Sequence, residues 1–262
     1  MQLQTSKWEM TYRGKRVTAI GNKKMYDWLH HLANTPLENI PKRYQFIETA
    51  IGELLNIPNR PADTYEYLVS KEFMLSKYMM KYIDKQFLDS KLTQIHMLDD
   101  FQMVFDSFSA GTSASTSIYG KHVLIKIDVF KFVNWIDTMY VHKAKSIGDG
   151  CSHIIACILR TLCHEMIHGL LQKFTPTLLD EHGKSVIIRS KDPFKHLEML
   201  KTYSDQSFVN EEPHFVLGQV KNEFQIFDGN QTQGGHKSFF MRILKNRFGQ
   251  TTAEHSYYKL KI

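Results

Sequence analysis

The sequence predicts an α+β protein with a helical core and a small antiparallel sheet, and three observations predict it. Most of the 262-residue chain repeats its apolar residues at helical spacing. The alternation that is typical of strands is confined to residues 8–19 and 101–127. Residues 151–173 are so uniformly apolar that a buried helix is expected there. A composition of 42% hydrophobic and 23% charged residues excludes a disordered chain and a disulfide-built miniprotein.

Residues 1–60 are predicted to form a mainly helical N-terminal extension, whose role the sequence does not indicate. It starts with a short hairpin over residues 8–19, which turns at Gly14. Two amphipathic helices follow, and the second opens at Pro41, because proline is favoured in the first turn of a helix. Further prolines place the end of the extension near residue 60. The two helices are expected over residues 22–33 and 41–55.

Residues 61–262 are predicted to form the main domain. Helices are assigned where apolar residues recur every three or four positions, and strands where β-branched and aromatic residues alternate with polar ones. A polar, charge-mixed stretch is too long for an ordinary connection and is therefore assigned as an insertion. In chain order we expect a helix over residues 62–91, a hairpin made by residues 101–105 and 117–127 around the loop 109–117, a helix over 129–140 capped by Asp128, the buried helix 151–173, an insertion over about 176–213, and a last helix over 237–247 that ends at Gly249.

The cysteines and the start of the chain predict an intracellular protein of the nucleus or cytoplasm that is not secreted. The three cysteines, Cys151, Cys157 and Cys163, form no C-x-x-C pair, and an odd, unpaired set fits a reducing compartment. All three are expected within the buried helix as small core residues. The first ten residues lack the apolar run of a secretory signal, and no uninterrupted apolar stretch is long enough to span a membrane. We therefore expect no membrane partner.

An H-E-x-x-H sequence lies within the predicted buried helix, from His164 to His168. Residues four apart lie on one face of a helix, so the two imidazoles can share one metal ion. Glu165 is placed to take a proton from a water that zinc has made more acidic. Two histidines and a glutamate are costly to bury in an apolar helix without a purpose. The pattern predicts one catalytic zinc ion with Glu165 as general base. The remaining histidines have no ligand spacing and are expected to be surface or structural residues.

The third zinc ligand is less well determined by the sequence. The metzincin extension requires Gly at position 171 and His at position 174, and Leu171 and Phe174 exclude that class. Glu223 would suit a site with two histidines and one glutamate. His236 follows two glycines that permit a close approach just before the last predicted helix. His182, within the polar insertion, is a weaker third option.

These residues and the segments around them resemble the SprT-like (Spartan-type) metalloprotease family. The resemblance runs from about residue 70 to the end of the chain and rests on motifs that occur in the family's order. These motifs are the segment Phe87–Leu92, the strand end Ile125–Asp128, the L-x-H-E-M-I-H helix from Leu162 to His168, Gly235-His236 with Phe240 close to a G-H-x-x-x-F motif, and the run Asn246–Gly249 followed by His255.

The resemblance implies a zincin-like core with His164, His168 and His236 as zinc ligands, and it favours His236 over Glu223. It also implies proteolysis of proteins that are bound or crosslinked to DNA, a role in DNA repair. The chain departs from the family in three respects. The 67 residues between His168 and His236 are more than a compact core needs, C-x-x-C pairs of a zinc ribbon are absent, and residues 1–60 have no counterpart.

A DNA surface is predicted near the last helix. With 33 basic and 27 acidic residues the chain carries a net charge of +6, which permits contact with nucleic acid but does not require it. Arg242, Lys245 and Arg247 lie along the last helix, where they could face phosphates. Tyr257 and Tyr258 could stack on unpaired bases. No motif that distinguishes bases is present, so sequence-independent binding is expected.

The leading hypothesis is therefore a zinc-dependent endopeptidase that acts on protein substrates, with DNA as a partner. The edge of the predicted sheet would hold an extended substrate segment by strand addition. One alternative is a gluzincin-like peptidase in which Glu223 is the third ligand and DNA has no role. Another is a non-catalytic nucleic-acid-binding or scaffold protein in which zinc is structural.

Overall fold

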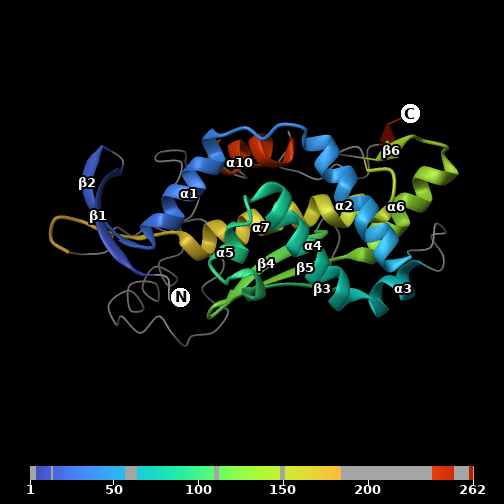
Figure 1. Cartoon of the computed structure of the whole chain (residues 1–262), viewed down its shortest axis with the longest axis horizontal. Helices are drawn as coiled ribbons and strands as arrows, with labels where there is room; N and C mark the ends of the chain where they lie inside the picture. Colours follow the sequence, from blue (N-terminus) through green and yellow to red (C-terminus); the bar gives the residue numbers. More distant parts are fainter. Residues whose placement is uncertain are drawn as a thin grey trace.

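The structure is an α+β arrangement in which helices surround one long central helix and a small sheet (Figure 1). It is a computed structural model that describes residues 4–12, 14–56, 64–108, 112–147, 151–183, 238–250 and 260–261. The α+β class predicted from the sequence is confirmed. The residues of the predicted 176–213 insertion beyond 183 lie outside the described part of the chain.

The sheet beside the central helix is mixed rather than antiparallel. It consists of β3 (Phe101–Phe105), β4 (Ala114–Tyr119) and β5 (His122–Ile127) in the order β3-β5-β4. Strands β4 and β5 pair antiparallel, whereas β3 and β5 pair parallel.

The predicted hairpin of this sheet was wrong in its pairing. The turn falls at Gly120, with a positive φ of 58°, and it divides the stretch 117–127 between β4 and β5. Residues 101–105 therefore make no hairpin with that stretch. They form β3, which lies parallel to β5 on the side away from β4.

The central helix α7 (Ile154–Phe174) begins at Ile154 rather than at Cys151, so Cys151 precedes it. His153 caps its first turn, because its ring Nδ1 accepts a hydrogen bond from the Ala156 N–H at 3.4 Å. By length and mean hydropathy α7 passes as a membrane-spanning helix, but 89% of the qualifying window is buried inside the protein. A core helix passes the same test, and the burial of α7 agrees with that role.

The other helices pack around α7 and the sheet, and most lie where the apolar periodicity predicts them. The long helix expected over residues 62–91 is instead divided at Lys71 and again after Phe87. The bounds are α1 (Lys23–Asn34), α2 (Ile40–Leu55), α3 (Thr64–Ser70), α4 (Glu72–Phe87), α5 (Lys91–Gln94), the 3-10 turn η2 (Leu98–Asp100), α6 (Val129–Val141, capped by Asp128 as predicted) and α10 (Ser238–Phe248).

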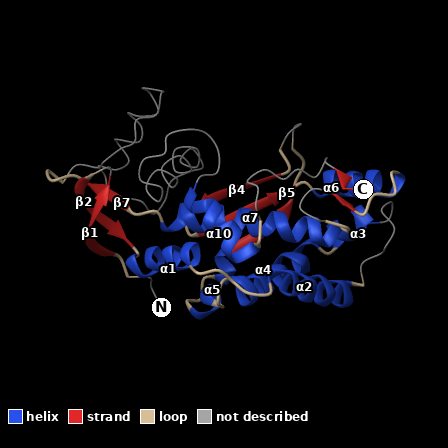
Figure 2. Cartoon of the chain, turned by 90° about the horizontal axis from the view of Figure 1, so that it is seen from above, coloured by secondary structure: helices blue, strands red, loops and turns tan. Residues whose placement is uncertain are grey.

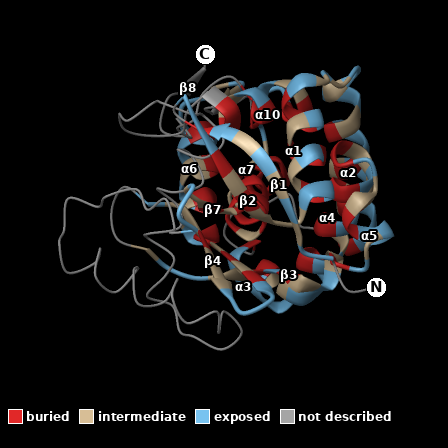
Figure 3. Ribbon diagram, turned by 90° about the vertical axis from the view of Figure 1, so that its left-hand side faces the viewer, coloured by how far each residue is buried: buried red, intermediate tan, exposed pale blue. Residues whose placement is uncertain are grey.

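Figure 2 shows the layers: α7 lies between strands β4 and β5 on one side and helices α1, α2 and α4 on the other. Helix α10 packs against both α1 and α7. One continuous hydrophobic core joins all of these elements, and α7 supplies its centre (Figure 3). The small strands β6 (Ser146–Ile147) and β8 (Leu260–Lys261) pair beside α6.

Residues 1–60 contribute to two parts of the structure. Strands β1 (Ser6–Tyr12) and β2 (Lys15–Gly21) form the predicted hairpin, and β7 (Thr177–Leu179) pairs with β2 to complete a second sheet. Helices α1 and α2 bury their apolar faces in the same core as α7. The helices of the predicted extension thus share one core with the H-E-x-x-H helix.

Candidate functional site

The two histidines of the H-E-x-x-H sequence lie on one face of α7, as the spacing predicts. Their ring centroids are 5.0 Å apart, with His164 buried and His168 partly exposed. Nitrogens bound to one zinc ion at 2.0–2.1 Å lie about 3.3 Å from each other, which rings at this spacing allow. The two imidazoles therefore fit a shared metal ion.

Phe240 of α10 packs on both imidazoles. Its ring centroid lies 5.0 Å from that of His164 and 4.4 Å from that of His168. Aromatic packing of this kind restricts the orientation of both histidine rings. The start of α10 is thereby held against the H-E-x-x-H helix.

The neighbouring Phe239 turns to the other side of α10, toward α1. Its ring packs edge-on against His30, with the centroids 4.7 Å apart. Burial lowers the pKa of His30 from its ordinary value, and the nearby Arg242 lowers it further. This imidazole is accordingly part of the α1–α10 packing, in line with the structural role predicted for histidines without ligand spacing.

Glu165 lies beside β4. The Thr116 hydroxyl is 2.6 Å from Oε2 of Glu165 and 3.0 Å from the Glu165 carbonyl oxygen. Glu165 is 7% exposed and Thr116 is 9% exposed, so this contact is well shielded from water.

Gly169, which directly follows His168, permits the close packing of α7 on the sheet. A Cβ atom at this position would lie 2.5 Å from Cγ1 of Val123 and 3.3 Å from Cε1 of Phe101. Gly169 was not among the residues predicted from the sequence to shape the site. Glycine inside a helix costs about 1 kcal/mol relative to alanine, so a glycine within the H-E-x-x-H helix was the available signal.

The outer edge of β4 is open among the described residues. The Asp128 N–H donates to the Ser113 carbonyl, so the alternation of an antiparallel pair points the backbone groups of Ala114, Thr116 and Ile118 away from β5. Within the described ranges no strand pairs with β4 on that side. The strand thus presents hydrogen-bonding backbone beside Glu165.

A third metal ligand is not among the described residues: there, no group of three His, Cys, Asp or Glu side chains could hold a metal ion. His236 and Glu223, the two main candidates, both lie outside the described ranges. His182 is described and exposed, next to Glu181 and with its backbone N–H bonded to Asp180.

No family model, no curated protein and no solved structure matches the chain. What the site can do must therefore be argued from its own residues.

The cysteines near the site are buried thiols. Burial raises the pKa of Cys163 and of Cys157 far above the ordinary value, so both stay protonated at neutral pH. A zinc ligand would have to be a thiolate. These residues fit the predicted role of small core side chains, although Cys151 lies before the helix rather than within it.

Of the predicted DNA contacts on α10, Arg242 and Lys245 are exposed. The guanidinium of Arg242 lies over the Phe239 ring, 5.5 Å from its centroid. Both charges are available to a phosphate. Tyr257 and Tyr258 lie outside the described residues.

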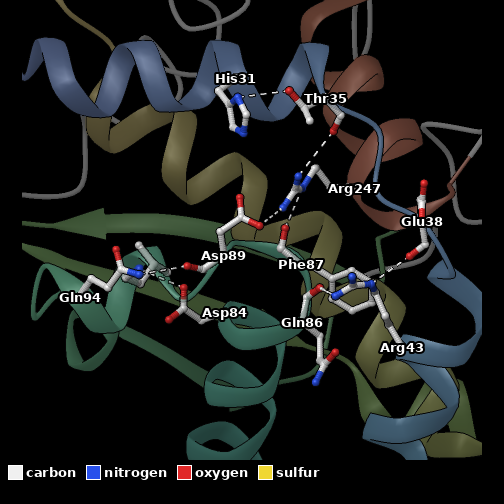
Figure 4. Close-up of polar contacts among 11 residues, drawn as sticks. His31, Thr35, Glu38, Arg43, Asp84, Gln86, Phe87, Asp89, Gln94 and Arg247 are labelled. Atoms are coloured by element: carbon white, nitrogen blue, oxygen red, sulfur yellow. Dashed lines mark hydrogen bonds and ion pairs between the residues drawn. The ribbon is translucent and has the colours of Figure 1, made fainter.

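Arg247, in contrast, is buried and only 2% exposed. Its Nε donates to the Phe87 carbonyl at 2.8 Å, and its Nη2 lies 2.5 Å from Oδ1 of Asp89 (Figure 4). Burial lowers the pKa of Arg247, and the ion pair with Asp89 opposes that shift. The guanidinium holds the end of α10 against the end of α4, and this arrangement leaves it no surface to offer to DNA.

Proposed function

We propose that the protein is a zinc-dependent endopeptidase of the SprT-like type, which cleaves proteins bound or crosslinked to DNA. The observation that carries the proposal is the placement of three side chains on one turn of α7. His164 and His168 have ring centroids 5.0 Å apart, and Glu165 lies between them in sequence and beside the open edge of β4. Two imidazoles, a carboxylate and an open strand edge are the components of a metallopeptidase site.

His236 is the proposed third ligand. Only one residue lies between it and Ser238, the first residue of α10, so its Cα is within about 7.6 Å of the Cα of Ser238. Phe240, one half-turn further on, contacts both α7 histidines. This short connection supports the choice of His236 as the third ligand. Glu223 is fifteen residues from Ser238, and the structure sets no comparable limit on its position.

The roles of the residues follow from their chemistry. Zinc, when bound, makes a water molecule more acidic and polarises a carbonyl group. Glu165 accepts the proton of the attacking water and delivers it to the nitrogen of the leaving amine. His164 and His168 would hold the metal, and Phe240 packs on their rings and restricts their orientation.

The open edge of β4 is the proposed binding site for the substrate. An extended segment that pairs with the outward backbone groups of Ala114, Thr116 and Ile118 would run alongside α7. Because such pairing uses main-chain groups, it accepts many sequences, and it requires a flexible or unfolded segment.

DNA is the proposed partner on the α10 side. Arg242 and Lys245 are exposed on the helix that also carries Phe240 and follows His236. A phosphate backbone on this face would bring a DNA-bound protein close to Glu165. Such contacts are independent of base sequence.

The test measures how fast the zinc-loaded chain cleaves a protein that binds single-stranded DNA, once with the DNA present and once without it. The same two assays are run on the Glu165→Gln variant. We expect cleavage that needs DNA and that falls by about 10²- to 10⁴-fold in Glu165→Gln, the range that a general base contributes. Cleavage that is equally fast without DNA would remove the DNA part of the proposal. Equal inactivity of wild type and variant, with DNA binding intact, would leave a scaffold protein.

A further inference from the structure

Thr116 is the point at which the sheet contacts the proposed general base. It lies in the middle of β4 and turns its side chain toward α7, where Oγ1 is 2.6 Å from Oε2 of Glu165. The hydroxyl belongs to the strand that is proposed to bind substrate. The hydroxyl has one hydrogen to donate, and the shorter of its two distances is the one to the carboxylate.

The threonine side chain is held in one orientation. A Cβ at Gly169 would lie 3.4 Å from Cγ2 of Thr116, so the methyl group packs on α7 at the glycine. β-Branched residues have few χ1 rotamers, and a methyl group fixed against Gly169 fixes the direction of the hydroxyl as well. The packing of α7 on β4 thus aims the Thr116 hydroxyl at Glu165.

The backbone groups of the same residue point in a different direction, within the plane of the sheet. Thr116 belongs to the alternate set of β4 residues whose N–H and C=O groups point away from β5. One residue therefore offers its main chain to the open edge and its side chain to the carboxylate.

We infer that Thr116 is a positioning residue that orients the Glu165 carboxylate relative to a substrate paired with β4. The inference rests on the proposed peptidase function. A carboxylate held by a shielded hydrogen bond keeps one rotamer, so its proton-accepting position is set before the substrate arrives. Without the hydroxyl, the Glu165 carboxylate is oriented less precisely and the chemical step slows, while metal and substrate binding are expected to stay unchanged.

The kinetic test compares full-length, zinc-loaded wild type with Thr116→Val, Thr116→Ser and Glu165→Gln. The probe is fluorescein-labelled casein in the presence of a single-stranded oligonucleotide. We expect Thr116→Val to lower kcat about 10- to 100-fold, the range for a misplaced catalytic group, with KM within about twofold and zinc content unchanged. Thr116→Ser keeps the hydroxyl and should recover most of kcat. Ser117→Ala, on the other face of the same strand, is the matched control and should behave as wild type.

A second readout does not depend on activity. Thr116→Val removes the donor from a shielded carboxylate, so it should lower the Tm of the wild-type chain by several degrees. In a Glu165→Ala background the same substitution should lower the Tm by less than half as much. Equal Tm shifts in the two backgrounds would show that residues 116 and 165 are not coupled, and would overturn the inference.

The kinetic outcomes separate this inference from the proposed function. If wild type is active and Glu165→Gln is not, but Thr116→Val retains the wild-type kcat, only the positioning role fails. If wild type and Glu165→Gln are equally inert, the peptidase function fails and the positioning role fails with it. A loss of kcat that follows a loss of zinc or of folded protein would assign Thr116 a merely structural role.

Discussion

The two edges of the central sheet differ in how their outward backbone groups are hydrogen-bonded. At the β3 edge, side chains of α4 take up the outward backbone groups: the Met103 N–H donates to Oγ of Ser76 at 2.8 Å, and the Phe105 N–H donates to Oε2 of Glu72 at 2.6 Å. At the β4 edge, no described strand pairs with the outward groups. An unpaired edge is a hazard for aggregation, and proteins usually cover it. Within the described ranges the open edge is the one beside Glu165, where the proposed function places the substrate.

The largest stability effect is expected at the closed edge. Ser76→Ala leaves the buried Met103 N–H without an acceptor, and Glu72→Ala does the same for Phe105. Each should lower the free energy of unfolding by about 1–3 kcal/mol in urea denaturation, with kcat/KM per folded molecule unchanged. Glu72→Gln retains an oxygen acceptor and should lose much less. A clear drop in kcat/KM in Ser76→Ala would contradict the assignment of this edge to stability alone.

A substitution at the open edge of β4 should change substrate binding rather than stability. Ala114→Pro removes an outward N–H at the first residue of β4, where proline is tolerated because no ladder bond of β4 and β5 is lost. We expect KM for an unfolded protein substrate to rise about tenfold, or about 1.4 kcal/mol. Ala114→Val keeps the N–H and serves as the control. If the proline variant has the wild-type KM, substrate does not pair with this strand.

The contact between α7 and the sheet is tested at Gly169. Alanine there forces a Cβ to within 2.5 Å of Cγ1 of Val123, so overpacking outweighs the gain in helix propensity and the net loss should be about 1–2 kcal/mol. The matched control is Gly52→Ala in α2, where a Cβ meets nothing within 4 Å. That substitution should raise the free energy of unfolding by about 0.5–1 kcal/mol. Equal effects at the two glycines would mean that α7 does not lie tightly on the sheet.

The smallest effects are expected from substitutions on α10, where the exposed Arg242 is compared with the buried Arg247. Arg242→Gln with Lys245→Gln should weaken binding of a single-stranded oligonucleotide and reduce the magnitude of the negative slope of log K against log salt by about 1.4. Arg247→Lys should lower the Tm, because lysine lacks the guanidinium fork that bonds Phe87 and Asp89, and should leave that slope unchanged. An unchanged slope in the double variant would exclude this helix as the DNA surface.

Local signals in the sequence predicted most helices and strands. The pairing of strands that are distant in sequence could not be predicted from such signals. The α7 helix was predicted to within a few residues, because its apolar run and the i, i+4 histidines are local features. The hairpin was assigned to the wrong strands because a single alternating stretch conceals the turn at Gly120, and no local pattern encodes the parallel partner of β5.

The same limit applies to side chains whose partners are distant in sequence. The burial of Arg247 depends on Asp89, 158 residues away, and the contact of Glu165 depends on Thr116, 49 residues away. A helical pattern indicates which face a residue occupies but does not identify what covers that face. For that reason the sequence pattern predicted Arg247 as a DNA contact together with Arg242 and Lys245.

The most direct measurement is the zinc content of the purified full-length chain by native mass spectrometry, for wild type and four variants. We expect one zinc ion per chain in wild type and in Glu223→Ala. Zinc should be lost from His164→Ala, His168→Ala and His236→Ala, because a site with two imidazoles left binds far more weakly. Zinc retained in His164→Ala or His168→Ala would contradict a metal centre on α7, and zinc lost from Glu223→Ala but retained in His236→Ala would reverse the choice of third ligand.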